Sequence, residues 1–294
     1  MSAPSHVLSR MKIPISKRIK TVLGRASGMT GMYARDFRAK MVVVAFHRVN
    51  DELAEDALTC GSAKFEAFCR FFAEHFRIVP LSEQVAASHT WKDMGGTLSI
   101  TFDDGYLDNY EVAAPILRKL GLPATFFVTT GYIGSSFRAH WDRDLTLAPR
   151  WMNWDQLRSL KAQGFDIGAH TDTHIDLGTA EPDIVSAELR VCREKLQHEL
   201  DGNIELFAYP FGGTENISPR SLQLVREAGF TCCLACCGGT NPPIADPFHL
   251  ARIGIADWFA TPHQFGYELV HAHHVRLPTM PGPATPGPRL SQAP

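Results

Sequence analysis

Strand-like and helix-like segments alternate along the chain from residue 41 to residue 255, and this alternation constrains the fold more than any other feature. The strand-like segments are short, apolar runs at 41–46, 76–81, 97–102, 123–128, 165–170, 204–210, 230–235 and 248–255. The helix-like segments, with apolar residues at three- and four-residue spacing, are 64–76, 82–89, 109–121, 154–164, 182–200 and 218–229. Such alternation predicts parallel strands joined by crossover helices.

About seven strand–helix units predict an α/β fold, a distorted (β/α)7-type barrel. We expect a single catalytic domain over residues 41–275. A doubly wound open sheet is the alternative. No G-x-G-x-x-G stretch follows the first strand, so the best sequence argument for a dinucleotide-binding sheet is missing.

Polar residues follow the predicted strands at a shared position, where each strand ends. In a β/α barrel the carboxyl ends of the strands meet at one rim, and that rim carries the chemistry. The residues that share this position are His47, Asp103, Asp104, His170, Tyr209 and Arg252. We therefore expect them to converge on one site.

Asp103 and Asp104 stand side by side in the stretch "ITFDDGYLDN". Adjacent carboxylates repel each other unless a cation, or a division of roles, relieves the repulsion. His170 and His174 are spaced i, i+4 in "GAHTDTH", so they would share one face of a helical turn and could hold one cation. With one aspartate they predict a site for Zn²⁺, with Co²⁺, Ni²⁺ or Mn²⁺ as alternatives. The second aspartate would then be free to accept a proton.

Charge is distributed unevenly along the chain. The whole chain has a net charge of −2, whereas residues 1–40 hold nine Lys or Arg and one acid, Asp36, a net of +8. We interpret residues 1–40 as a basic N-terminal extension. A short amphipathic helix within it is predicted from apolar residues near helical spacing, Ile15, Ile19, Val22 and Leu23. Such a helix could contact an anionic membrane, and a solvated extension is the alternative.

The ends of the chain and its cysteines bear on its location. The N-terminus lacks the apolar core of a secretory signal, and seven cysteines is an odd number. We therefore expect a cytoplasmic protein, with the inner membrane face as a second location. Residues 276–294, rich in Pro and Gly, predict a disordered tail. The stretch "CCLACC", residues 232–237, is interpreted as small buried apolar residues rather than a metal site.

Three motifs resemble those of one known family. "TFDDGY", "HTDTH" and "FAYPFG", in this order, are similar to the motifs of the polysaccharide deacetylase family, also called the NodB-homology domain or carbohydrate esterase family 4. The resemblance implies a distorted β/α barrel that removes acetyl groups from N-acetylated sugars with a divalent metal ion. By position, it implies Asp103 as the catalytic base, with Asp104, His170 and His174 as metal ligands. It also implies that the backbone N–H of Tyr209 stabilises the oxyanion.

The resemblance indicates two candidates for the general acid. "VVAFHRV" is similar to a "YHRV"-type strand of a subgroup that includes poly-N-acetylglucosamine deacetylases, which implies His47 as the acid. The usual late L-x-H motif is absent from "FHLARIGI", where His249 is the alternative acid. Many members have an arginine at the start of the third motif, but this chain has "LFA" there. Arg252 is the candidate replacement.

Substrate contacts are assigned to Arg252, Trp154 and Pro210. Three other tryptophans are candidates for a sugar platform, with a core role as the alternative: Trp141, Trp151 and Trp258. The expected partner is an N-acetylated sugar of a bacterial surface glycan, or its lipid- or nucleotide-linked precursor, and not a nucleic acid. An amidohydrolase acting on a small cyclic amide, and a catalytically silent carbohydrate-binding module, remain alternative functions.

Overall fold

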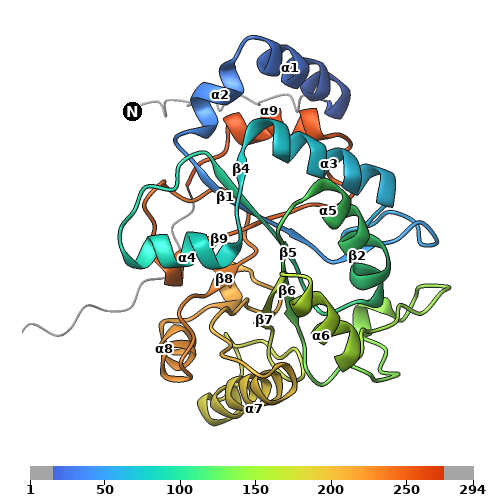
Figure 1. Ribbon diagram of the computed structural model, residues 1–294, viewed down its shortest axis with the longest axis vertical. Coiled ribbons are helices and arrows are strands. Elements are labelled where there is room, and N and C mark those ends of the chain that lie inside the picture. The colour runs from blue at the N-terminus through green and yellow to red at the C-terminus, as the bar shows by residue number, and fades with distance from the viewer. Residues whose placement is uncertain (1–15, 275–294) are drawn as a thin grey trace, which may run out of the picture.

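The computed structural model describes residues 16–274, which form a ring of short parallel strands with helices packed around it (Figure 1). Five strands make the continuous part of the ring in the order β10-β1-β5-β6-β7, and every pair is parallel. Their bounds are Met41–Phe46 (β1), Thr97–Phe102 (β5), Thr125–Val128 (β6), Asp166–Ala169 (β7) and Ile253–Gly254 (β10).

Isolated bridges and one short strand pair close the ring. Ala169 bridges Phe207, and Ala208 bridges Leu234. Leu234 begins β8 (Leu234–Ala235), which pairs with β9 (Leu250–Ala251), and β9 is followed at once by β10. The wall is therefore continuous, and the predicted distorted (β/α)7-type barrel is confirmed. Its irregular stretch is the predicted strand 204–210, where only these bridges form.

Helices cover the outer surface of the barrel (Figure 1). Their bounds are Lys17–Met29 (α1), Met32–Phe37 (α2), Ser62–His75 (α3), Leu81–His89 (α4), Ala114–Leu120 (α5), Trp154–Ala162 (α6), Pro182–Leu200 (α7), Pro219–Glu227 (α8) and Pro262–Val270 (α9). Short turns of π- or 3₁₀-helix span Asn109–Ala113, His140–Asp142, Thr214–Asn216 and Pro247–His249. Within residues 16–274 no helix combines the length and the apolar character needed to cross a bilayer.

Three further short strands lie outside the ring. β2 (Arg48–Val49) pairs with β3 (Thr59–Cys60) beyond the end of β1. β4 (Arg77–Ile78) pairs with the start of β5. The predicted strand 76–81 is therefore shortened to two residues.

The side chains of β5 separate into two sets with different surroundings. Leu98, Ile100 and Phe102 are buried in the main apolar core, and Phe102 stacks on Phe46 and Phe126 at ring distances of 5.6 and 4.8 Å. Because successive side chains of a strand point to opposite faces, Thr101 and Asp103 point the other way, where Arg252 contacts both. The apolar face fixes the strand, and the polar face is left for the site.

The N-terminal segment differs from the prediction. Residues 17–37 form α1 and α2 and pack against α9 and α3, so this part of the predicted extension 1–40 belongs to the folded body. Helix α9 was not predicted because "PHQFGYELV" contains both Pro and Gly within nine residues. The predicted tail, 276–294, lies outside the described residues.

Candidate active site

The two aspartates after β5 separate because the chain turns sharply between them. The backbone N–H of Asp103 still donates to Phe46 in the strand ladder, at 3.0 Å. Asp104 then has a φ of 73° and Gly105 a φ of 92°. The φ of Gly105 favours glycine, and a Cβ there would crowd the side chain of Ile133 at 3.0 Å. The turn sends the two carboxylates toward different partners.

His170 and His174 lie on the loop that follows β7, and the predicted helical turn is absent. Thr171 and His174 have φ values of 64° and 59°, which a right-handed helix does not allow. Two contacts stabilise this loop. The N–H of His174 donates to Thr171 Oγ1 at 2.9 Å, and Glu188 of α7 accepts the N–H of Asp172 at 2.9 Å. The i, i+4 spacing therefore brings the imidazoles together through a folded loop.

Asp104, His170 and His174 form a buried cluster. Asp104 Oδ1 lies 3.4 Å from His170 Nε2 and 3.3 Å from His174 Nε2. One ligand atom from each residue lies within 4.8 Å of the others. His170 Nδ1 lies 2.8 Å from the carbonyl oxygen of Ala208. Because that oxygen can only accept, Nδ1 carries the proton and the Nε2 lone pair is free to bind an ion.

The donor set of this cluster fits a divalent metal ion. Asp104 Oδ1 is buried and has no hydrogen-bond partner among the described residues. A buried carboxylate oxygen without a partner is costly, and a cation between it and the two imidazoles would satisfy it. Two nitrogens and one carboxylate oxygen are ligands that zinc and its first-row neighbours accept. The residues present therefore fit such an ion.

Asp103 pairs with Arg252 inside the barrel. Arg252 Nη1 and Nη2 donate to Asp103 Oδ1 and Oδ2, each at 2.7 Å, and Arg252 is fully buried. Burial alone would raise the pKa of Asp103, but the Arg252 guanidinium and His170 hold it below its usual value. Arg252 was predicted to bind substrate. Instead its guanidinium is committed to Asp103, which keeps that carboxylate ionised.

The two candidates for the general acid lie in different places. His47, just after β1, lines the same cavity as Asp103 and the three-residue cluster. Burial lowers its pKa below the ordinary value, although Asp104 and Asp103 act in the opposite direction. His249 precedes β9, so it lies at the amino end of a strand, and it contacts Asp246 at 2.8 Å. His249 is not among the residues lining the cavity.

The predicted backbone donor at Tyr209 is already used. Its N–H donates to the carbonyl oxygen of Leu234 at 3.0 Å, because residue 209 continues the barrel wall beside β8. The predicted oxyanion role of this group is therefore wrong. Phe211, two residues later, lines the cavity with a φ of 62°. Its N–H has no backbone or side-chain acceptor within residues 16–274, so this group is not already committed, unlike the N–H of Tyr209.

Aromatic residues surround a cavity of about 770 Å³ that contains the site. Trp141, Phe211 and Trp258 line it. The ring of His174 packs between Trp141 and Phe211, at centroid distances of 4.6 and 4.7 Å. Sequence reasoning named Trp141 and Trp258 only among several candidates, because tryptophans in a core and in a site look alike in sequence.

Two predicted substrate contacts are corrected. Trp154 begins α6 and packs against the main apolar core, not the cavity. Its place in the first turn of an amphipathic helix directs it to the barrel wall. Pro210 is buried and absent from the cavity lining, which its neighbours Tyr209 and Phe211 form. Trp151 is also buried, and stacks on Tyr106 at 4.5 Å.

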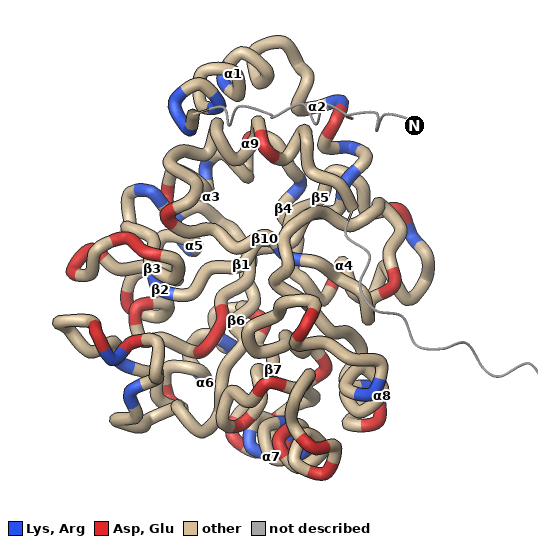
Figure 2. The backbone as a smooth tube through the Cα atoms, turned by 180° about the vertical axis from the view of Figure 1, so that it is seen from behind, with Lys and Arg blue, Asp and Glu red and all other residues tan. Residues whose placement is uncertain are grey.

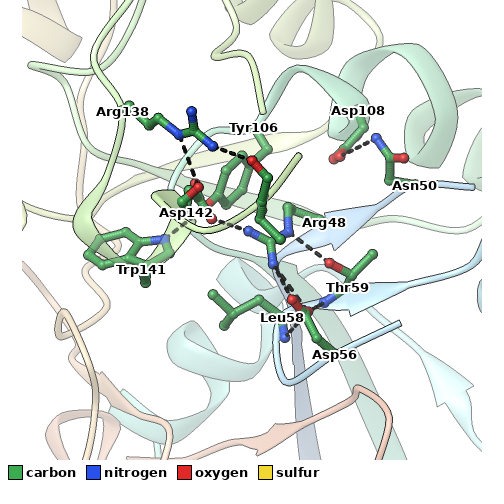
Figure 3. A network of polar contacts seen from close by, with 11 residues as sticks. Arg48, Asn50, Asp56, Leu58, Thr59, Tyr106, Asp108, Arg138, Trp141 and Asp142 are labelled. Atoms are coloured by element: carbon green, nitrogen blue, oxygen red, sulfur yellow. Dashed lines mark hydrogen bonds and ion pairs between the residues drawn. The ribbon is translucent and has the colours of Figure 1, made fainter. Parts of the chain in front are cut away.

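A buried polar network positions the segment that carries Trp141 (Figure 3). Arg48 forms an ion pair with Asp142, and both side chains are 1 % exposed. Asp142 Oδ2 accepts the hydroxyl of Tyr106 at 2.9 Å, and that hydroxyl accepts Trp141 Nε1–H at 2.8 Å. Arg48 also donates to Asp56 at 2.9 Å. Sequence reasoning did not find this network, because Arg48 and Asp142 are far apart in the chain and no motif links them.

The barrel and the cluster define the class to which the protein belongs. A β/α barrel with two imidazoles and adjacent carboxylates at its carboxyl rim is a fold whose rim can hold a divalent ion. Within that class, the polysaccharide deacetylase family model matches residues 90–233. This segment of the chain, which contains all three motifs, therefore matches the family, as the motifs predicted.

The identity to individual proteins of known sequence or structure is low, between 22 and 24 % for three of them. The YxkH protein of Bacillus subtilis (strain 168) is 23 % identical over 194 residues, which cover 65 % of this chain and 63 % of that relative. The Streptococcus pyogenes deacetylase PplD, solved with acetate, has a TM-score of 0.65 and 24 % identity over 77 % of this chain and 96 % of its own. IcaB from Ammonifex degensii has a TM-score of 0.66 and 22 % identity over 80 % of this chain and 98 % of its own. At these identities the two structures establish the shared fold.

Proposed function

We propose that this protein is a metal-dependent hydrolase that removes N-acetyl groups from amino sugars of a glycan or glycan precursor. The observation that carries the proposal is the position of Asp103 directly beside the Asp104–His170–His174 cluster in one cavity. A carboxylate that is not itself a metal ligand, placed next to a metal-type ligand set, can act as the base when water hydrolyses an amide. The family match supports the acetamido group as the target.

Asp104, His170 and His174 would hold the ion, and zinc is the proposed metal. A divalent ion bound there would polarise the acetyl carbonyl and lower the pKa of a neighbouring water. Asp103 accepts the proton that this water loses on attack. The two-pronged contact with Arg252 aims the carboxylate and leaves further lone pairs on its oxygens for that proton.

Two further groups of the reaction, the developing oxyanion and the leaving amine, each need a hydrogen-bond or proton donor. The Phe211 N–H is the proposed donor to the developing oxyanion, and removal of such a donor typically costs about 3 kcal/mol of transition-state stabilisation. His47 is the proposed general acid for the leaving amine. Because burial lowers its pKa, the protonated imidazole is a stronger acid than an ordinary histidine. It therefore gives its proton to the amine readily.

The shape and lining of the cavity suit a sugar ring. Trp141, Phe211 and Trp258 line the cavity, and the apolar ring faces of sugars pack on aromatic side chains. We assign substrate contact to these three residues. This replaces the assignment of Trp154 and Pro210.

The proposal is tested by measuring acetate release from N-acetylglucosamine oligomers. The protein is assayed after treatment with a chelator and after Zn²⁺ is restored, with Co²⁺, Ni²⁺ and Mn²⁺ compared in parallel. We expect activity to disappear with the chelator and to return with the metal. Release of acetate that is indifferent to chelation would contradict the metal role. Bound metal without acetate release from any acetylated glycan would favour a silent binding module.

A further inference from the structure

Helix α1 packs on the protein body through its small and polar face. Thr21 and Lys20 are partly buried, and Gly24 and Ser27 are buried. A Cβ on Gly24 would lie 1.9 Å from the carbonyl oxygen of His263, at the start of α9. This contact shows how closely the two helices approach, and why glycine stands there. Lys20 also pairs with Glu268 of α9 at 3.1 Å.

The apolar residues of α1 point away from the body. Ile19, Val22, Leu23 and Met29 are 54, 66, 41 and 89 % exposed. At about 100° per residue, Ile19, Val22 and Met29 lie on the side of the helix away from the body. Leu23 lies at the border of that side, toward Ser27. A surface helix of a globular protein normally has the reverse arrangement, with its apolar side against the core. We name this outward-facing set of four residues the apolar face of α1.

Helix α1 carries cations and no acid along its length (Figure 2). Arg18 and Arg25 project from one border of the face and are exposed. Neither forms an ion pair with any residue in the range 16–274. By contrast, Lys17 and Lys20 are engaged with the body, since Lys17 Nζ donates to the carbonyl oxygen of Asp257 at 2.9 Å. Two uncompensated charges therefore border an exposed apolar surface.

Helix α1 packs, through the side opposite its apolar face, on a helix that forms part of one wall of the cavity. Helix α9, on which α1 packs, contributes Phe265, Glu268 and Leu269 to the cavity lining. Trp258 and Phe259, just before α9, line the same part. This part of the cavity is largely apolar.

We propose that α1 docks this protein on an anionic phospholipid surface, with its apolar face in the interface and Arg18 and Arg25 at the lipid phosphates. Apolar side chains bordered by cations are what such a surface binds. A second copy of the chain fits the same face less well, because a two-fold contact would bring the unpaired arginines of both copies together. The docking is independent of the hydrolytic reaction, since none of these residues lies in the catalytic cluster.

The test is sedimentation of the full chain with vesicles of phosphatidylcholine, with and without phosphatidylserine. We expect binding to the vesicles that contain phosphatidylserine and little to the others. The triple variant Ile19→Ser/Val22→Ser/Leu23→Ser should bind at least tenfold more weakly. Arg18→Gln/Arg25→Gln should lose roughly 25-fold, at about fivefold for each cation removed. The single variant Val22→Glu gives the same test with less change to the helix.

Matched controls lie at the other end of the molecule. Ile184→Ser removes an apolar side chain that is 53 % exposed on α7, which lies opposite α1 along the longest axis (Figure 1). Arg190→Gln/Arg220→Gln removes two exposed cations from α7 and α8. Both controls should bind like the unchanged chain, and circular dichroism should show the same helix content throughout. Equal binding to both kinds of vesicle, or unchanged binding by the α1 variants, would overturn the proposal. So would a stable dimer that the triple variant converts to a monomer.

Discussion

Arg252 holds both carboxylate oxygens of Asp103, with Nη1–Oδ1 and Nη2–Oδ2 distances of 2.7 Å. The two residues stand 149 positions apart in the sequence, and both are buried. Burial of Asp103 raises the pKa of its carboxyl group and Arg252 lowers it, with a net decrease below the ordinary value. The proposed base is therefore ionised because of a partner that lies between β9 and β10, near the end of the barrel.

Replacing Arg252 by Met should make the proposed base harder to ionise. The pKa of Asp103 rises without the guanidinium, so the acidic limb of the pH profile of kcat/KM should move to higher pH. The stability that Asp103 contributes, present above its unfolded pKa and lost as the pH falls through its folded pKa, should disappear. Removing one partner of a buried pair typically costs about 3–5 kcal/mol. Urea unfolding and pH–rate profiles measure both effects.

Arg252→Lys is the informative comparison for that variant. Lysine keeps the charge but cannot make the two-pronged contact. We expect the acidic limb to stay closer to that of the unchanged chain, with a lower kcat. An acidic limb that does not move in Arg252→Met would show that Asp103 is not the titrating group.

Substituting Asn at the two neighbouring aspartates should separate metal binding from proton transfer. Asp103→Asn should bind Zn²⁺ normally but lose a factor of about 10²–10⁴ in kcat, because a general base is removed. Asp104→Asn should lose at least about a hundredfold in Zn²⁺ affinity. Removing a residue that only hydrogen-bonds to a metal ligand already costs about 10- to 100-fold, and removing a ligand costs more. Calorimetric titration with Zn²⁺ and acetate release distinguish the two. Normal turnover by Asp103→Asn would refute its assigned role.

Asp142→Asn should weaken both the stability of the fold and the contact with substrate. The change removes the ion pair with Arg48, whose side chain is 1 % exposed. We expect a loss of about 3 kcal/mol in the free energy of unfolding, at the lower end for buried pairs because Arg48 keeps Asp56. The change also disturbs the hydrogen bonds by which Asp142 and Tyr106 position Trp141. Because Trp141 is a proposed substrate contact, KM should rise more than kcat falls. Asp144→Asn, at an exposed position two residues later, is the control, and equal effects in both variants would contradict this account.

The stability of the protein should fall between about pH 4 and pH 7 because of Asp108. Burial raises the pKa of this carboxyl group to about 7, although Val49 N–H and Asn50 donate to it. The folded state then binds more protons than the unfolded state in this range, so unfolding becomes easier as the pH rises. The full cost is on the order of 4 kcal/mol at most.

The measurement is urea unfolding at pH 5 and pH 8. Asp108→Asn removes the titration and should flatten the dependence on pH, even if other losses lower the overall stability. Glu52→Gln, at an exposed position in the neighbouring loop, should leave the dependence unchanged. An equally steep dependence in Asp108→Asn would assign it to another group.

The barrel and the Asp104–His170–His174 cluster could both be predicted from local sequence patterns. The helix predicted over 182–200 matches α7 at both ends, because Pro182 and a regular apolar spacing mark its bounds. The run 97–102 matches β5, because Leu98, Ile100 and Phe102 alternate with small polar residues at the two-residue period of a strand. The position of Asp103, Asp104 and His170 directly after predicted strands then indicated that they share one site. The sequence could not foresee the loop conformation at Thr171 and His174, because their left-handed backbone depends on Glu188 in a later helix.

The sequence by itself determined the alternation of the main strands and helices over residues 41–255 and the two motifs that supply the metal-type ligands. Both depend on spacing within short segments. Only the tertiary structure decided how Arg252 and Asp142 are used, since ion pairs between distant segments leave no local pattern. It also decided that the N–H of Tyr209 belongs to the barrel wall and that α1 turns its apolar side outward. In each case the role of the residue depends on its contact with a distant part of the chain. That contact exists only in the folded protein.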